Sequence, residues 1–429
     1  MHVRGFGLVA FVSVALSACG ARDALWVGGD AGVGGASSGA SGTSSSSGTG
    51  GAGGGPLVCP ELRWAGDPVR VAVPFGGALG APKLVRVSAT RWAVAFEAND
   101  GAGRLIASFA VEDPFGAWPP ITGAPDANLP TALPFAVGEG EPGRFAYAAS
   151  DSAGRQLLGQ AEPGQNGSTL VDWPGPVAPM RFLSRSPSGA YAIGRGAGDT
   201  GLYVDVVAAY GPNPQVGTVG MLGCAESVLA AAVPSPKGGF LVANTADLAF
   251  DDCADPDLPG PPVVAQLHHL LDGKAEQRSA FSELSPVREL RLAPRPEGGW
   301  LGIAREGSQI FAVHPVDADG YASEPLVEWV GELDNDDTHD LAAIEEELAL
   351  AVVRTESFDG SRSLLLAVRQ GFAGFGMASS QGLELVPTGA PSLGTEAGRT
   401  SLLVAVVDGS RAQPTIALLR ADCGLVGVE

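Results

Sequence analysis

Two acidic clusters are the segments of this sequence whose residue types could hold a metal ion. The first holds Asp334, Asp336, Asp337 and Asp340, and the second holds Asp251, Asp252, Asp255 and Asp257. Carboxylate oxygens are the ligands that calcium prefers. Neither cluster has the Asp-x-Asp-x-Asp-Gly order and terminal Glu of an EF-hand loop, so we expect both to be solvated loops. Calcium at residues 334–340 is the one cofactor hypothesis that the sequence suggests, and we predict no other cofactor.

The remaining candidate motifs favour structural roles. The histidines are His2, His268, His269, His314 and His339, and their spacing does not form a metal triad. Gly196 to Gly201 fits a dinucleotide-binding pattern, but strand-like residues flank it on both sides, which favours a hairpin turn. Asp317-Ala318-Asp319-Gly320 carries the Asp-Gly signal of a hairpin. The sequence has no Ser/His/Asp order, Walker loop or His-Glu-x-x-His helix, so we predict no catalytic residue.

Composition and charge restrict the fold class and the partners. Apolar residues make up 45% of the chain and charged residues 17%, which supplies a large buried core. The 62 Gly and 33 Pro residues favour short strands joined by tight turns, and we expect an all-β protein. A net charge of −21 argues against nucleic acid and against a basic membrane-binding face, because both need Lys and Arg clusters.

The N-terminus has the residues of an export signal. Arg4 precedes an apolar stretch from Phe6 to Leu16, and Leu16-Ser17-Ala18-Cys19 follows it. This segment resembles the lipobox of bacterial lipoproteins, and the alternative is an ordinary secretory signal cut nearby. The resemblance implies cleavage after residue 18 and diacylglycerol on Cys19, which would then be the membrane attachment. Gly20 stands where enterobacterial inner-membrane lipoproteins carry Asp, which favours the outer membrane within a bacterial cell envelope.

The sequence divides into three parts. Residues 1–18 form the expected lipoprotein signal peptide, 19–56 a lipid-anchored linker, and 57–429 a single folded domain. Val27 to Pro56 is almost entirely Gly, Ser, Ala and Thr, a composition that cannot bury enough apolar surface to order itself. As a flexible coil, its thirty residues reach roughly 30 Å. We therefore expect the linker to hold the domain clear of the headgroups.

The folded part repeats one unit of about fifty residues. Each unit has a short apolar strand, a turn, and a strongly apolar second strand with a large residue near its start; the equivalent large residues are Trp92, Phe145, Tyr191, Phe240, Trp300, Leu350 and Leu402, 46 to 60 residues apart. A third strand and a less regular fourth stretch follow. Four strands in about fifty residues resemble a propeller blade, although the kelch and WD signature residues do not occur. Seven repeats predict a seven-bladed β-propeller of four-stranded blades, with two β-sandwich domains as the alternative.

Two local predictions follow from this architecture. The last unit ends after its third strand, so we expect Val69 to Val73 to supply the outer strand of the last blade and to close the ring. The segment Leu341 to Leu350, with Glu345-Glu346-Glu347, has a helix-friendly composition. We nevertheless predict a hairpin there, because Leu348 to Val353 continues as a β-rich run.

Apart from Cys19, four cysteines are present, and an even number in an exported chain favours two disulfides over free thiols or zinc. Three pairings are possible. The propeller architecture favours Cys59 with Cys423, which flank the strands that meet at ring closure, and leaves Cys224 with Cys253.

These observations predict a cell-envelope lipoprotein that acts as a binding or scaffolding module through its propeller loops. Its expected partners are the membrane, through the lipid on Cys19, and an envelope protein or glycan. The alternative is an extracellular lyase or hydrolase that degrades a polymer with carboxylates at the blade mouths. The lining of the central channel distinguishes the two classes, since converging carboxylates and histidines would favour an enzyme.

Overall fold

The structure is a computed structural model that describes most of residues 62–423. The parts of this range that lie outside the described residues are 74–79, 100–102, 123, 132–134, 152, 175–177, 197–201, 209–213, 223–228, 248–262, 282–286, 306–309, 326, 331–337, 345–346, 356–360, 370–374, 380–382 and 396–400. The described residues form strands and no helix. No helix among them is therefore long and apolar enough to cross a membrane.

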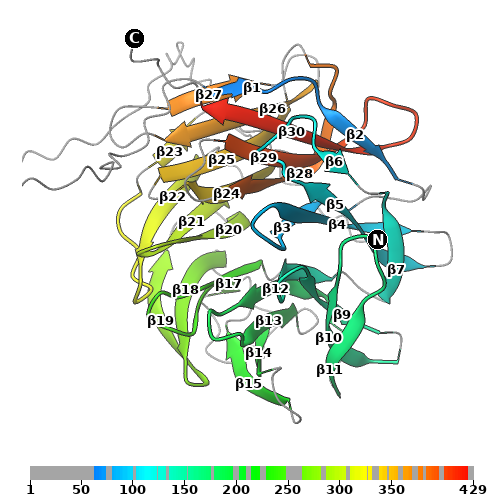
Figure 1. Ribbon diagram of the computed structural model, residues 1–429. Helices are drawn as coiled ribbons and strands as arrows, with labels where there is room; N and C mark the ends of the chain where they lie inside the picture. Colours follow the sequence, from blue (N-terminus) through cyan, green and yellow to red (C-terminus); the bar gives the residue numbers. More distant parts are fainter. Residues whose placement is uncertain are drawn as a thin grey trace, which may run out of the picture.

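The strands form seven antiparallel sheets arranged as blades around a centre (Figure 1). Blade 1 contains β3 (Lys83–Arg86), β4 (Arg91–Asn99), β5 (Arg104–Glu112), β6 (Ile121–Thr122) and β7 (Asp126–Thr131). Blade 2 contains β8 (Ala136–Glu139), β9 (Phe145–Ser150), β10 (Arg155–Ala161) and β11 (Ser168–Pro174). Blade 3 contains β12 (Met180–Arg185), β13 (Tyr191–Gly196), β14 (Leu202–Ala208) and β15 (Gln215–Leu222).

Blade 4 contains β16 (Ala230–Pro234), β17 (Phe240–Asp247), β18 (Val263–Leu271) and β19 (Lys274–Phe281). Blade 5 contains β20 (Val287–Arg295), β21 (Gly298–Arg305), β22 (Ile310–Asp317) and β23 (Val327–Val330). Blade 6 contains β24 (Thr338–Ile344), β25 (Glu347–Thr355), β26 (Arg362–Arg369) and β27 (Phe375–Ser379). Blade 7 contains β28 (Pro387–Thr395), β29 (Ser401–Asp408) and β30 (Thr415–Cys423), joined by β1 (Leu62–Trp64) and β2 (Val69–Ala72).

The seven-bladed propeller predicted from the repeat is confirmed, and the two-sandwich alternative is wrong. The second strands are continuous apolar runs because both faces of each sheet are covered by neighbouring blades. Every residue of β9 and β21 is buried, for example. The apolar clusters accordingly lie between blades: one joins blades 1 and 2 through Val85 and Phe145, and another joins blades 3 and 4 through Ala192 and Phe240.

A repeated turn that the sequence analysis did not identify begins the second strand of blades 3 to 5. Its pattern is Pro-x-Gly-(Ala/Gly)-aromatic, and it spans Pro187 to Tyr191, Pro236 to Phe240 and Pro296 to Trp300. The first Gly of each has a positive φ, of 89°, 94° and 151° respectively, a conformation that favours glycine. The residues and the glycine conformation of this turn therefore repeat together with the strands of blades 3 to 5.

Trp300 differs from the other large residues with which the repeat aligned it. Tyr191 and Phe240 each lie six residues after their cross-strand partners, Arg185 and Pro234. Trp300 lies seven residues after its partner, Ala293, because the pairing of blade 5 is shifted by one residue. A shift of one residue turns a side chain to the opposite face of its sheet. Trp300 therefore packs in the cluster shared with blade 6, and the neighbouring Leu301 packs in the cluster shared with blade 4.

The ring is closed by the N-terminal strands. As predicted, Val69–Ala72 pairs with β30 as an outer strand of the last blade. The shorter β1 also pairs with β30, which the sequence analysis missed, so two short strands share this outer edge (Figure 1). Arg70 adds an ion pair from its Nε to Oδ2 of the fully buried Asp408, at 2.7 Å. Because β1 and β2 pair with β30, that strand is not left as an exposed edge that could pair with another chain.

Three turn predictions are also confirmed. The acidic segment forms the hairpin between β24 and β25, in which Ile344 pairs with Glu347. The glycine-rich pattern at 196–201 connects β13 and β14 of one hairpin, with Gly196 opposite Leu202. Asp317 starts a tight turn in which its Oδ1 accepts hydrogen bonds from the backbone N–H of Asp319 and Tyr321.

Candidate functional site: the central channel

The first strands of all seven blades, β3, β8, β12, β16, β20, β24 and β28, line a cavity of about 400 Å³ at the centre of the ring. Much of its wall is apolar, including Leu84, Val137, Leu183, Leu292 and Leu393. Blade 1 contributes five lining residues, and each of the other blades contributes three or fewer. The cavity therefore exists only in the closed ring.

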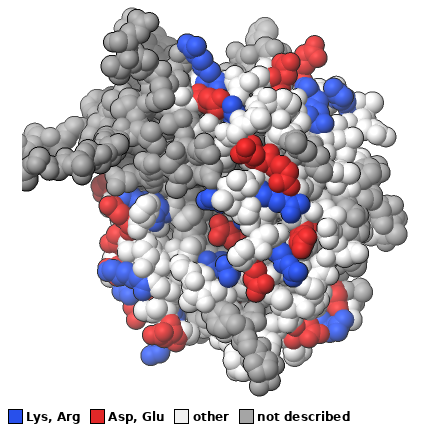
Figure 2. All heavy atoms as spheres, in the orientation of Figure 1, with Lys and Arg blue, Asp and Glu red and all other residues white. Residues whose placement is uncertain are grey.

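The charged residues in this wall are mostly cations. Lys83, Arg86 and Arg185 line the cavity together with one described carboxylate, that of Glu139. Arg86, Glu139 and Arg185 end the first strands of blades 1, 2 and 3, so the three charges follow one another around the same end of the channel. The whole chain has the opposite balance, with 26 Lys and Arg against 47 Asp and Glu. Figure 2 shows both signs interspersed over the middle of the drawn face.

Lys83 lies near the other end of the channel, where β3 begins. A strand rises about 3.3 Å per residue, so the backbones of Lys83 and Arg86 are roughly 10 Å apart along it. Enclosure within the ring lowers the pKa of the Lys83 amine, and the nearby Arg291 lowers it further, while Asp340 and Glu289 oppose this effect. Its side chain is only partly exposed, and no described carboxylate lies within ion-pair distance of it.

Arg185 has an incompletely satisfied guanidinium. Its Nε is buried and has no hydrogen-bond partner among the described residues. Its Cζ lies 5.9 Å from the ring centroid of Tyr191, whose hydroxyl accepts a hydrogen bond from Gln160 Nε2 at 2.8 Å. The aromatic contact holds the guanidinium by cation–π attraction.

A polar network joins blades 5 and 6 beside Lys83. Glu289 contacts His339 Nδ1 at 2.6 Å and Arg291 Nη2 at 2.5 Å, and Arg291 Nε donates to the His339 carbonyl at 3.1 Å. Burial alone would raise the pKa of Glu289, but His339, Arg291 and Arg288 outweigh it and lower the pKa to about 2. Glu289 is therefore held ionised as a structural counter-charge.

At two glycines of the channel wall, neighbouring atoms lie too close for a side chain. A Cβ on Gly138 would lie 2.6 Å from the carbonyl oxygen of Leu183, and a Cβ on Gly394 would lie 2.7 Å from the Trp92 ring. Both distances are too short for any side chain. The absence of side chains at these positions lets adjacent first strands, and the Trp92 indole, approach closely.

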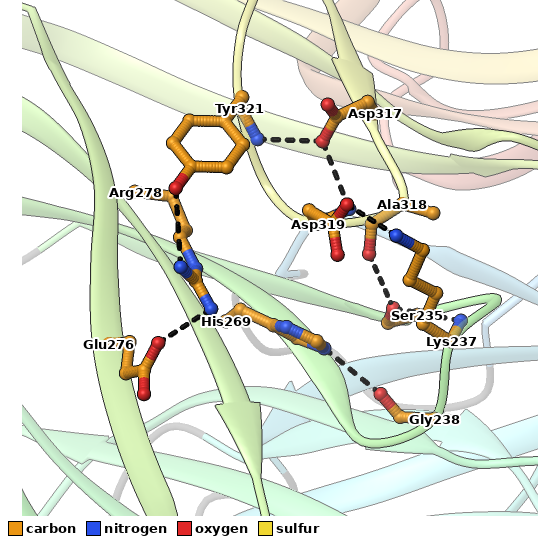
Figure 3. Close-up of polar contacts among 10 residues, drawn as sticks. All are labelled: Ser235, Lys237, Gly238, His269, Glu276, Arg278, Asp317, Ala318, Asp319 and Tyr321. Atoms are coloured by element: carbon orange, nitrogen blue, oxygen red, sulfur yellow. Dashed lines mark hydrogen bonds and ion pairs between the residues drawn. The ribbon is translucent and has the colours of Figure 1, made fainter.

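A second polar cluster lies between blades 4 and 5 (Figure 3). Lys237 pairs with Asp319, Ser235 Oγ donates to the Ala318 carbonyl at 3.0 Å, and Arg278 Nη1 donates to the Tyr321 hydroxyl at 3.2 Å. His269 lies beside it, with Nε2 3.0 Å from the Gly238 carbonyl oxygen. Because these groups satisfy one another across the blade boundary, the cluster holds the two turns together.

The predicted calcium ligands can be placed only in part. Asp334, Asp336 and Asp337 lie outside the described residues. Asp340 lies on β24, and its Oδ2 accepts a hydrogen bond from the backbone N–H of Leu393 at 2.8 Å, which links blades 6 and 7. This contact gives Asp340 a structural role, and calcium binding at 334–340 stays a prediction.

The predicted disulfides also stay predictions. Cys59, Cys224 and Cys253 lie outside the described residues, as does the lipidation site Cys19. Cys423 is buried at the end of β30, where it pairs in register with Leu62, three positions after Cys59. This register brings the segment that follows Cys59 to the strand that ends in Cys423.

The adjacent histidines His268 and His269 are both buried on β18. In a strand with one solvated face, one of two consecutive residues would point inward and the other outward. Consecutive strand residues do point to opposite faces, but in a blade each face packs against a neighbour, so both positions are buried. Desolvation lowers the pKa of His268 to about 4.

The channel cations were not predictable from the sequence. Lys83 and Arg86 lie on β3 of blade 1, whereas Arg185 ends β12 of blade 3, about one hundred residues later in the sequence, and only folding of the ring brings the two strands to the same channel. One signal was available, since Lys83 is one of only three lysines in 429 residues and stands at the start of a first strand. No short motif connects it to the arginines.

Comparison with known proteins shows likeness in fold. No protein-family model matches the chain, and no curated protein sequence does. Among solved structures, the β-propeller domain of the Trilobed protease from Pyrococcus furiosus is 8% identical, covering 83% of this chain and 99% of that one, with a TM-score of 0.45. Sqt1 from Chaetomium thermophilum is 13% identical over 84% and 87% of the two chains, with a TM-score of 0.47. BBS1N, crystallised in complex with ARL6DN, is 9% identical over 84% and 98%, with a TM-score of 0.46.

Proposed function

We propose that this protein is a binding module of the bacterial cell envelope whose central channel holds a small anionic ligand. A seven-bladed ring fits a binding or scaffolding role. The observation that carries the proposal is the charge of the channel. Among the described residues, three cations and one carboxylate line it, in a chain where acidic residues greatly outnumber basic ones. Guanidinium groups bind carboxylates and phosphates through paired, charge-assisted hydrogen bonds.

The channel supports binding better than cleavage of a polymer. Glycoside hydrolysis ordinarily uses two carboxyl groups that flank the scissile bond. The described lining supplies one, Glu139, and it stands between Arg86 and Arg185 along the ends of the first strands. We therefore propose binding rather than hydrolysis or elimination as the activity of this site.

Calorimetric titration with inorganic phosphate and with citrate tests the proposal. Arg185→Glu should weaken binding of either anion by at least about tenfold, since a hydrogen bond to a charged group contributes roughly 1.5–3 kcal/mol. Arg104→Glu is the matched control, because it makes the same change of charge at a side chain that is 45% exposed on β5, outside the channel. It should alter affinity by less than about twofold. Absence of saturable binding, or equal losses in both variants, would contradict the proposal.

We also propose that Cys19 carries the lipid that keeps the module at the membrane. The lipobox-like residues before it and the Gly/Ser linker after it support this assignment, and several acyl chains would give durable attachment at about 0.8 kcal/mol per buried CH₂. Bacterial cells grown with labelled fatty acid should incorporate the label into wild-type protein and into Cys224→Ser, which retains Cys19. Cys19→Ser should lack the label and leave the membrane fraction. Unlabelled wild-type protein would exclude the anchor.

A further inference from the structure

Lys83 carries an amine whose position and surroundings are not explained by anion binding alone. Its side chain lines the cavity, is only partly exposed, and has no ion-pair partner within 4.0 Å among the described residues. The two other lysines of the chain differ in this respect. Lys237 pairs with Asp319 with its side chain 55% exposed, and Lys274 is exposed at the turn that begins β19.

We propose that the ε-amino group of Lys83 forms a reversible imine with small aldehydes or ketones that enter the channel, and prefers those that also carry an anionic group. The preference for an anionic group rests on the proposed function, whereas imine formation does not. The ligand class is thus a small carbonyl compound with a carboxylate or phosphate, such as a 2-oxo acid. The excess of cations over carboxylates among the described lining residues would attract its anionic end, and the carbonyl carbon would face Lys83.

The reaction needs no co-reactant beyond the ligand. The ammonium of Lys83 loses a proton to solvent, and its nitrogen lone pair attacks the carbonyl carbon to give a carbinolamine. The former carbonyl oxygen takes up protons and leaves as water, and a C=N bond remains. Hydrolysis reverses these steps.

The surroundings of Lys83 favour the neutral amine that this reaction requires. The groups that act on it are Arg291 and Glu289 from β20 and Asp340 from β24, and Arg86 lies on its own strand. Glu289 is already paired with His339 and Arg291, and Asp340 accepts the Leu393 backbone N–H. Their remaining charge therefore offsets only part of the enclosure and of the Arg291 charge, which together lower the pKa of Lys83.

Site-resolved labelling of the full-length protein tests this inference with internal controls. Formaldehyde and glyoxylate, each with cyanoborohydride to reduce the imine to a stable amine, would be applied at pH 7, and peptide mass spectrometry would report modification at each of the three lysines. Lys83 should react several-fold faster than Lys237 and Lys274, because a lowered pKa leaves more of its amine unprotonated at neutral pH. Lys274→Arg should leave this preference unchanged, and Lys83→Arg should remove it.

The two probes separate this inference from the proposed function. If formaldehyde and glyoxylate both select Lys83, and glyoxylate does so more strongly, both the imine and the anion preference are supported. If formaldehyde selects Lys83 but glyoxylate has no advantage, the imine inference holds and the anion preference fails. Labelling of Lys83 no faster than that of Lys237 with either probe overturns the inference, whatever calorimetry shows for phosphate and citrate.

Discussion

Val71→Asp is expected to destabilise the domain by about 3–5 kcal/mol, because it places an unpaired carboxylate in a buried apolar site. Val71 lies on the ring-closing strand β2 and is 8% exposed. It packs in the cluster that blade 7 shares with blade 1, together with Phe109 and Leu418. The substitution therefore weakens both the outer strand and the contact between the first and last blades.

Ala72→Asp is the matched control for this prediction. Ala72 is the next residue of the same strand and is exposed, so the same new charge faces water there. It should change the free energy of unfolding by no more than about 0.5 kcal/mol. Urea unfolding of the two variants measures the difference. Equal losses would show that β2 does not hold the ring through its buried face.

The stability of the domain should fall by about 3 kcal/mol between pH 6.5 and pH 4 through His268 alone. The pKa of His268 is lowered to about 4 by burial, while an unfolded histidine titrates near 6.5. Between these pH values the unfolded chain binds a proton at His268, whereas the folded chain does not. The contribution to stability is thus complete above pH 6.5 and is lost as the pH falls toward 4.

His268→Phe should remove this acid sensitivity, since a phenyl ring of similar size does not titrate. It also eliminates a buried Nε2 that has no hydrogen-bond partner among the described residues. Glu289→Gln tests the assignment, because the lowered pKa of about 2 places the contribution of Glu289 above pH 4.5 and its loss between 4.5 and 2. The two variants should change different parts of the curve of stability against pH. Parallel curves for wild type and His268→Phe between pH 6.5 and 4 would refute the prediction.

The blade architecture could be predicted because its causes are local. Each second strand is an apolar run buried on both faces, and the turn residues recur at a similar spacing, so the repeat is visible without tertiary information. The closing strand at residues 69–73 followed from counting, since the last unit lacked a fourth strand. The three-residue β1 could not be found in this way, because so short a segment becomes a strand only through its partner β30.

The channel chemistry was not predictable from local pattern. A charged residue at the end of a strand ordinarily faces water, and nothing near Arg86 or Arg185 in the sequence marks them as neighbours. Trp300 shows the same limit on a smaller scale. Its turn looks like those of blades 3 and 4, yet a difference of one residue in pairing sends the indole to the opposite face.

The pairing of β1 and β2 with β30 also determines when, during synthesis, the ring can close. The strands β1 and β2 find their partner only when residues 415–423 have been made, so the ring cannot close on a nascent chain that lacks these residues. Contacts between such distant segments form slowly, because a long loop must be closed first. A polypeptide built in this way keeps an unclosed ring until its last blade has been made.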